Sequence, residues 1–168
     1  MSGQVHRLVP VAKVVGLASS SMLTAYIASF SIATVPALSA APVSTTDIAK
    51  QWNYAFELGR STAPPFAVTC ASCFAFLAYQ SRHIKGSLPV TPSFLYAAAA
   101  IIAPCIVPYT LTIMAPTISA IVSKAQGKAN APSEAETKAL LEKWRGQNMQ
   151  RAYITGTAAV LSAIAILA

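Results

Sequence analysis

The chain has 168 residues, of which 55% are hydrophobic and only 10% are charged, whereas charged residues make up about 25% of an average soluble domain. This composition excludes an ordinary soluble domain and is typical of an integral membrane protein. The 12 basic and 5 acidic residues leave a net charge of +7, but the basic residues lie between the apolar runs, which favours contact with lipid headgroups over nucleic-acid binding.

Four apolar runs follow one another along the chain, at about residues 9–34, 64–80, 94–116 and 150–168. A helix needs about 20 residues to cross a bilayer, so the first and third runs are long enough and the other two are short. Each short run follows an amphipathic segment with Trp, Arg and amide side chains, residues 46–62 and 133–151, into which its helix is expected to extend. We therefore predict an all-α fold, an integral membrane four-helix bundle, as a single domain over residues 1–168.

The first run follows basic residues and ends near small residues, as a signal peptide does. Its apolar stretch, residues 14 to about 38, is longer than the roughly 7–15 residues of a signal peptide, so we expect a retained transmembrane helix. Small residues recur in it at every fourth position: Ala12, Gly16, Ser20, Thr24 and Ala28. Such a stripe predicts close approach of a neighbouring helix.

The second run contains Cys70 and Cys73 in a C-x-x-C pattern, which membrane-bound thiol oxidoreductases coupled to quinones also carry. A reactive thiolate needs a nearby cation or a helix N-terminus, and this pair lies mid-run without an adjacent charge. We therefore favour two buried apolar side chains and keep redox chemistry as a less favoured alternative.

His83 follows the second run, between Arg82 and residues 84–85. A loop residue that faces the headgroups is the simpler interpretation. It is nevertheless the best-placed conventional base, because an imidazole accepts a proton near neutral pH. His6 and His83, the two histidines, are not spaced to share a metal, so no metal site is expected.

The third run carries Pro104 and Pro108 one turn apart, which predicts a kink because each proline removes a helical hydrogen bond. Carbonyls freed inside a membrane need partners. Tyr109 and Thr112 follow at once, and their hydroxyls either repair the kink or line a polar cavity. Pro116 is expected to end this helix.

Before the fourth run, Ser133 and Glu136 form a capping box, so we expect one helix that begins directly after Ser133 and reaches the C-terminus. Trp144, Asn148 and Arg151 fall on one face of this helix where it enters the apolar phase. A cation in that position is costly and is usually functional.

The segment before the second run is similarly equipped, with Trp52, Tyr54 and Arg60. Because both segments enter the membrane from the same side, we predict that they share a polar site near one membrane face. The alternative is that these side chains are interfacial anchors. Counting basic residues puts the loop between the third and fourth runs in the cytoplasm.

No Gly-x-Gly-x-x-Gly, Walker, Gly-x-Ser-x-Gly or His-Glu-x-x-His motif occurs, so nucleotide, flavin and hydrolase chemistry has no sequence support. If the chain is an enzyme, we expect it to work without a bound cofactor.

Several motifs occur in a defined order: residues 16–36 with their serines, residues 52–59 with Pro64, Tyr-Thr-Leu-Thr-Ile-Met-Ala-Pro-Thr at 109–117, and Trp144-x-x-x-Asn148-x-x-Arg151. This ordered set resembles the anthrone oxygenase-like family, also called domain of unknown function 1772, over nearly the whole chain. One departure is Ile118, where the family usually has Asn after Met-x-Pro-Thr. This leaves open a changed substrate or a different chemistry.

The resemblance implies a membrane oxygenase of secondary metabolism that oxidises an anthrone-like aromatic polyketide to a quinone, with O2 as co-substrate and no cofactor. It implies a lipophilic aromatic ligand and a location in the endoplasmic reticulum or another endomembrane, and it leaves open a homo-oligomer or biosynthetic partner enzymes. On this hypothesis Arg151 and Asn148 stabilise the oxyanion. His83 is the first choice for the base and Tyr109 the weaker one.

The same hypothesis assigns the remaining candidates to substrate binding, with the two tryptophans as flat walls: Trp52, Tyr54, Arg60, Thr112 and Trp144. A competing hypothesis is a non-catalytic membrane scaffold that binds a lipophilic metabolite or a partner enzyme. A flat apolar pocket beside Arg151 would favour the oxygenase, whereas a closed bundle there would favour the scaffold.

Overall fold

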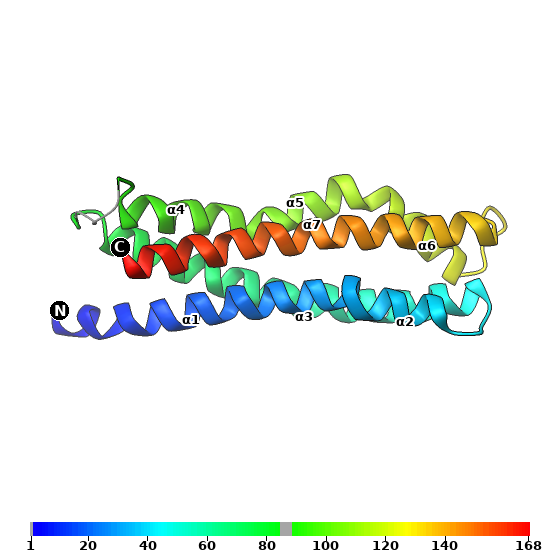
Figure 1. The fold of residues 1–168 in the computed structure, drawn as a ribbon, viewed down its shortest axis with the longest axis horizontal. Coiled ribbons are helices and arrows are strands. Elements are labelled where there is room, and N and C mark those ends of the chain that lie inside the picture. The colour runs from blue at the N-terminus through cyan, green and yellow to red at the C-terminus, as the bar shows by residue number, and fades with distance from the viewer. Residues whose placement is uncertain (1, 85–88) are drawn as a thin grey trace. The chain divides into compact units, whose positions relative to one another are not determined.

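The computed structural model describes residues 2–84 and 89–168, and in that part of the chain the regular secondary structure is entirely helical (Figure 1). The helices are α1 (Ser2–Ser29), η1 (Phe30–Thr34), α2 (Val35–Ala40), α3 (Thr45–Gln80), α4 (Pro92–Ile102), η2 (Ala103–Cys105), α5 (Ile106–Tyr109), η3 (Thr110–Met114), α6 (Ala115–Ala125) and α7 (Glu134–Leu167). Of these, η1 and η3 are π-helices and η2 is a 3₁₀-helix.

Within the described residues, four helical stretches are long and apolar enough to cross a membrane: Arg7–Ala40, Thr45–Gln80, Pro92–Ala125 and Glu134–Leu167. Each has 34 or 36 residues, more than the roughly 20 that a bilayer requires. The all-α, four-helix prediction is confirmed, and both amphipathic segments are continuous with the apolar runs that follow them. Four apolar helices indicate an integral membrane protein.

The start of α7 follows the predicted capping box. The Ser133 backbone N–H donates to the Glu136 carboxylate at 2.7 Å, and the Glu136 N–H donates to the Ser133 hydroxyl at 3.3 Å. Two of the helix's initial N–H groups thereby find partners. The helix then runs without a break to Leu167, as the sequence predicts.

The predicted kink of the third stretch is confirmed, because the helix passes through η2, α5 and η3 between residues 103 and 114. The prediction that Pro116 ends this helix is wrong. Pro116 lies in the first turn of α6, which continues to Ala125. A proline is tolerated there because the N–H that it lacks has no helical partner in a first turn.

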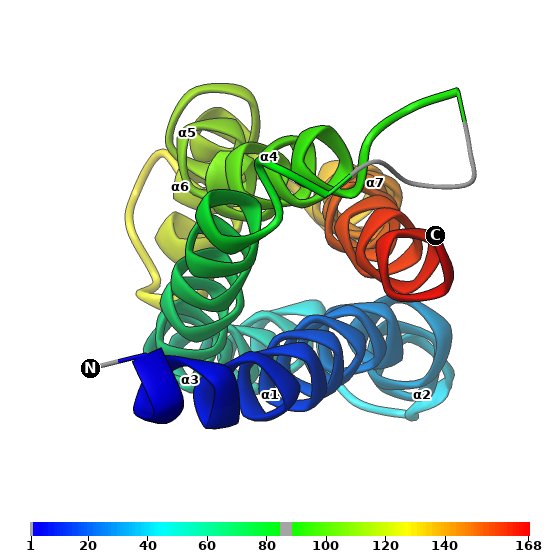
Figure 2. The same ribbon diagram turned by 90° about the vertical axis from the view of Figure 1, so that its left-hand side faces the viewer.

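The described chain divides into two compact units. Unit 1 comprises Met1–Thr24, Pro64–Ile106 and Tyr153–Ala168, and unit 2 comprises Ala25–Ala63 and Val107–Ala152. In unit 1, segments of α1, α3, α4 and α7 run alongside one another (Figures 1 and 2). Their buried side chains form one core: Ala12, Cys70, Phe74, Leu77, Leu95, Tyr96, Ala99, Ala103, Ala158 and Ala165.

The small-residue stripe of α1 allows close packing in unit 1. A Cβ atom added to Gly16 would lie only 2.8 Å from Cε1 of Phe74 on α3. On α7, a Cβ added to Gly156 would lie 3.3 Å from Cγ2 of Thr24. The hydroxyl oxygens of Thr24 and Thr155 also lie 3.0 Å apart, within hydrogen-bond distance. The stripe therefore contacts two neighbouring helices.

Unit 2 has its own core of side chains from α2, α3, η3, α6 and α7: Val35, Ile48, Ala49, Trp52, Met114, Ile121, Leu141 and Trp144. Ile118, the departure from the family motif, is partly buried against this core. Most of the sequence-predicted site residues belong to unit 2.

Candidate functional site

The candidate site begins with an irregularity of the first helical stretch. In the π-helix η1, the Val35 N–H bonds to the Phe30 carbonyl, five residues earlier. The Ser31 carbonyl therefore loses Val35, its α-helical donor, and the residue that would replace it in a π-helix is Pro36, which has no N–H. A buried carbonyl in this position needs a donor from elsewhere.

Helix α7 supplies that donor. Arg145 Nε donates to the Ser31 carbonyl at 2.8 Å, and the Ser31 hydroxyl donates back to the Arg145 carbonyl at 3.0 Å. Ser31 is 1% exposed, so both bonds form in a buried environment. These reciprocal bonds fix the register between η1 and α7 in unit 2.

Asn148 lies one turn further along α7 and is 2% exposed. Its amide nitrogen donates to the Ile27 carbonyl at 2.8 Å and to the Ser31 hydroxyl oxygen at 3.0 Å, while its amide oxygen accepts from Arg151 Nη1 at 3.1 Å. An amide nitrogen has two hydrogens, and here both are donated to protein acceptors. The geometry therefore favours a role in which Asn148 holds Arg151 over direct donation to a substrate oxyanion.

Arg151 is half-buried in unit 2 and interacts electrostatically with Tyr109 of α5. The Tyr109 hydroxyl donates to the side-chain oxygen of Gln150. A guanidinium and a phenol are thus brought together beside the buried amide of Asn148. This combination can bind an oxygen anion and exchange a proton.

Trp52 and Trp144 also meet in unit 2. Their ring centroids are 5.2 Å apart at an interplanar angle of 89°, and Trp52 stacks on Phe56 at 5.2 Å and 7°. The two tryptophans are only 1% and 2% exposed. Their faces therefore pack largely against protein, whereas the sequence hypothesis uses them as walls for a substrate.

Buried polar atoms of unit 2 without a hydrogen-bond partner among the described residues include Tyr26 Oη, Gln147 Oε1 and three atoms on or next to the core: Trp52 Nε1, Trp144 Nε1 and Thr117 Oγ1. Thr117 lies on α6 between Met114 and Ile121, two members of the same core as the tryptophans. Buried polar groups without partners are uncommon in folded proteins. Their concentration near this core marks it as a place where a polar ligand would find donors.

The other predicted binding residues do not join this arrangement. Tyr54 is 77% exposed, and Arg60 is exposed and ion-paired with Glu57 at 3.5 Å. The Thr112 hydroxyl donates to the Pro108 carbonyl at 2.7 Å, so it repairs the kinked backbone.

His83 belongs to unit 1, where it lies exposed in the turn that follows α3. Its Nε2 atom accepts from Arg82 Nε at 2.9 Å, and the Arg82 guanidinium also lies 4.0 Å from the centroid of the Tyr79 ring. The imidazole thus contacts a neighbouring cation at the end of its helix, and it is not among the residues that unit 2 brings together.

Sequence reasoning missed the structural roles of Ser31, Arg145 and Gln147. Gln147 Nε2 donates to the Ile113 carbonyl in η3 at 3.2 Å, so both π-helices bond to polar side chains of α7. The available signal was a proline two residues after each π-helix, Pro36 and Pro116. Read together with the polar residues of α7, Pro36 indicates a carbonyl that lacks a main-chain donor, that of Ser31, which accepts from Arg145.

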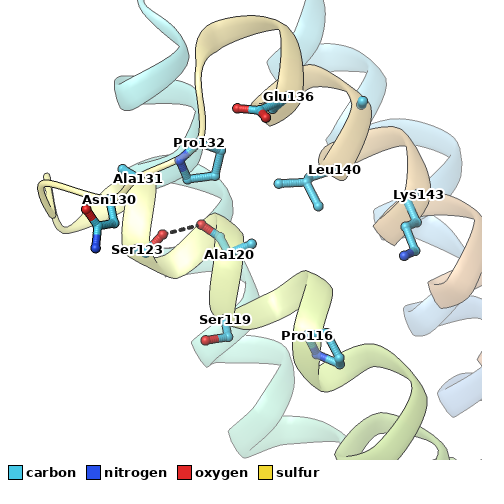
Figure 3. Close-up of a pocket in the computed structure, with 11 residues that line it drawn as sticks. Pro116, Ser119, Ala120, Ser123, Asn130, Ala131, Pro132, Glu136, Leu140 and Lys143 are labelled. Carbon is cyan, nitrogen blue, oxygen red and sulfur yellow. Dashed lines mark hydrogen bonds between the residues drawn. The ribbon is translucent and has the colours of Figure 1, made fainter.

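A groove of about 790 Å³ lies in unit 2 between α6 and the start of α7 (Figure 3). It is lined by Pro116, Ser119, Ala120, Ser123, Asn130, Ala131, Pro132, Glu136, Ala139, Leu140 and Lys143. Neither Asn148 nor Arg151 lines it, so it is not the flat pocket beside Arg151 that the oxygenase hypothesis calls for.

The cysteine pair lies in unit 1. Cys70 is fully buried in the core and its thiol contacts the Ala67 carbonyl at 3.3 Å, while Cys73 is partly buried. All three cysteines are free. In the part of the chain that the structure describes, no group of three or more His, Cys, Asp or Glu residues is arranged to hold a metal ion.

Comparison with known proteins gives a consistent result. A family model described as anthrone oxygenase matches residues 52–161. The anthrone oxygenase encC of Aspergillus fumigatus is 31% identical over 150 residues, which cover 79% of this chain and 80% of that protein. The anthrone oxygenase ptaC of Pestalotiopsis fici is 27% identical over 120 residues, 68% of this chain and 82% of that protein. No solved structure matches the chain.

Proposed function

Because the chain belongs to the anthrone oxygenase family, we propose that it is a membrane-bound oxygenase that converts an anthrone-type aromatic polyketide into the corresponding quinone. The observation that carries this proposal is the match to the family over residues 52–161, a range that contains Trp52, Tyr109, Trp144, Asn148 and Arg151. The apolar helices support a lipophilic substrate that reaches the protein from the bilayer.

The oxidation of an anthrone requires few functional groups from the protein. Removing one proton from the methylene between the two aromatic rings gives an enolate, whose charge lies largely on the ketone oxygen. The enolate reacts with O2 to form a hydroperoxide, and loss of water leaves the second carbonyl. One oxygen atom of O2 thus stays in the new carbonyl, and the other leaves as water with the two methylene hydrogens, so the reaction needs no external reductant. We therefore extend the proposal to an enzyme that works without a cofactor.

In this mechanism Arg151 stabilises the enolate oxygen. A guanidinium that is half-buried among apolar helices acts at a lower effective dielectric than one in water, which strengthens its attraction for an anion. The indole N–H groups of Trp52 and Trp144 are buried and have no partner among the described residues. We propose that these N–H groups, in place of the ring faces, bind oxygen atoms of the substrate.

Two side chains compete for the role of base. Tyr109 is supported by its position, because its phenol interacts electrostatically with Arg151, the proposed oxyanion donor. His83 is supported by its residue type, because histidine is the side chain that most often serves as a general base in enzymes. Replacing each in turn, by Tyr109→Phe and His83→Ala, separates them, because only the loss of the true base should abolish turnover at saturating substrate.

The proposal is tested with purified protein in detergent micelles or liposomes, a hydroxylated anthrone, and air or argon as the gas phase. Quinone formation is followed by absorbance, and labelled O2 should place one labelled oxygen atom in the quinone. Arg151→Ala should lower kcat by about 10²- to 10³-fold, the effect of losing an oxyanion donor. Arg7→Ala, at an exposed position of α1, is the matched control.

Anthrones oxidise slowly without an enzyme, so the rate in protein-free micelles is measured as the background and subtracted from each enzyme rate. A wild-type rate equal to that of protein-free micelles would refute the proposed function. Retained activity in Cys70→Ser and Cys73→Ser would exclude the thiol oxidoreductase hypothesis. Binding of the anthrone without any turnover would favour a non-catalytic scaffold.

A further inference from the structure

We propose that Ser31 is a positioning residue for Arg151, acting through the amide of Asn148. Ser31 binds the amide nitrogen, and the amide oxygen holds the guanidinium. This goes beyond the family match, because Ser31 lies outside the matched residues 52–161. Only the kinetic consequence of the inference rests on the proposed function.

The direction of every hydrogen bond in this chain of contacts is fixed by chemistry. A carbonyl oxygen only accepts, so the hydrogen between Ser31 and Arg145 comes from the Ser31 hydroxyl. The hydroxyl oxygen is then the acceptor for Asn148 Nδ2. In the flipped orientation, the amide oxygen would lie 2.8 Å from the Ile27 carbonyl oxygen, so that two acceptors would face each other. The amide nitrogen would face Arg151 Nη1, so that two donors would face each other. The partners therefore permit one orientation, the one that presents the amide oxygen to Arg151.

Burial makes this arrangement stiff. Ser31 is 1% exposed and Asn148 is 2% exposed, so water does not compete for either side chain. Hydrogen bonds in such surroundings support one another, and the loss of one partner leaves another buried polar group unpaired. Arg151 lies three residues after Asn148 on the same face of α7, and it is held at 3.1 Å by an amide that cannot rotate.

The π-helix provides the reason why a serine is required at residue 31. The Ser31 carbonyl accepts from Arg145 Nε at 2.8 Å, and the Ser31 side chain likewise faces α7, where its hydroxyl donates to the Arg145 carbonyl. Alanine would keep the backbone contact with Arg145 but would leave one Asn148 hydrogen without an acceptor. The amide would then be fixed by the Ile27 carbonyl alone.

The kinetic test compares Ser31→Ala with Ser29→Ala in the anthrone assay. The Ser29 hydroxyl is exposed and donates to Tyr26 of its own helix, so its loss is the matched control. Ser31→Ala should lower kcat by roughly two- to tenfold, the effect of one net hydrogen bond, with KM unchanged. Adding Asn148→Ala to Ser31→Ala should give the same rate as Asn148→Ala alone, because both variants break one pathway.

A second readout does not depend on activity. Butanedione modifies accessible arginines, and the rate at each arginine is followed by peptide mass spectrometry. Modification of Arg151 should be faster in Ser31→Ala and Asn148→Ala than in the wild type, while that of Arg7 stays unchanged. Thr24→Val removes another hydrogen bond between α1 and α7, in unit 1. Butanedione should modify Arg151 of this variant as slowly as it modifies Arg151 of the wild type.

The inference is overturned if Ser31→Ala matches Ser29→Ala in both kcat and the rate of Arg151 modification. It is also overturned if Thr24→Val raises the rate of Arg151 modification as strongly as Ser31→Ala does. If Ser31→Ala does not fold, Ser31→Cys keeps the volume with a weaker acceptor, and an intermediate effect on both readouts is expected. A wild-type protein that turns over no anthrone refutes the proposed function, whereas the modification rates still decide on the position of Arg151.

Discussion

Replacing Gly16 by alanine tests the packing of the small-residue stripe against α3. The new Cβ atom would lie 2.8 Å from Cε1 of Phe74 and 3.0 Å from Cβ of Cys73, and Phe74 is fully buried, so its ring cannot move into solvent. Overpacking of this kind costs about 1–3 kcal/mol. Alanine is a better helix former than glycine by about 1 kcal/mol. We therefore expect Gly16→Ala to lower the free energy of unfolding by about 1 kcal/mol.

Gly146→Ala is the matched control, because it lies within α7 and a Cβ atom there meets nothing within 4 Å. It should raise the free energy of unfolding by about 1 kcal/mol, so the two variants should differ by about 2 kcal/mol. The assay is denaturant unfolding in detergent micelles, followed by far-UV circular dichroism. Phe74→Leu should remove most of the cost of Gly16→Ala. Equal unfolding midpoints for Gly16→Ala and Gly146→Ala would refute the close-packing argument.

Thr117→Val should raise the free energy of unfolding by about 1 kcal/mol, because it replaces a buried hydroxyl without a partner among the described residues by a methyl group of similar shape; a lower unfolding midpoint would contradict this. Ser133→Ala should lower the free energy of unfolding by about 1 kcal/mol, because the Ser133 hydroxyl caps α7 by accepting from the Glu136 N–H. It should also speed amide hydrogen exchange in the first turn of α7. Trp52 and Trp144 are the only tryptophans of the chain and both are buried, so aqueous iodide should barely quench their fluorescence. Strong quenching would mean that this core is open to water.

The long helices were predictable because their signals are local. Apolar runs, the Ser133 capping box and the prolines at 104 and 108 each act within a few residues, and the structure follows all three. The error at Pro116 has the same origin. A proline ends a helix or opens one, and only the π-helix before it shows that this one lies in a first turn.

The interior of the candidate site was not predictable in the same way. The sequence aligned Trp144, Asn148 and Arg151 on one helix face, and the structure keeps them together on α7. What Asn148 does depends on Ile27 and Ser31, which lie 121 and 117 residues away along the chain. No periodicity encodes that register, because it follows from the π-helix in the first stretch and from the bond between Arg145 and the buried Ser31 carbonyl.

The two π-helices account for two of the polar side chains of α7, those of Arg145 and Gln147. Each π-helix is followed two residues later by a proline, and each has a carbonyl that accepts from an α7 side chain, Ser31 from Arg145 and Ile113 from Gln147. In an apolar phase such carbonyls must be satisfied by the protein itself. Polar residues on a membrane helix are therefore not all candidates for chemistry. Those bound to a neighbouring backbone build the site, and the amide that they orient, with both its hydrogens committed, holds the guanidinium of Arg151.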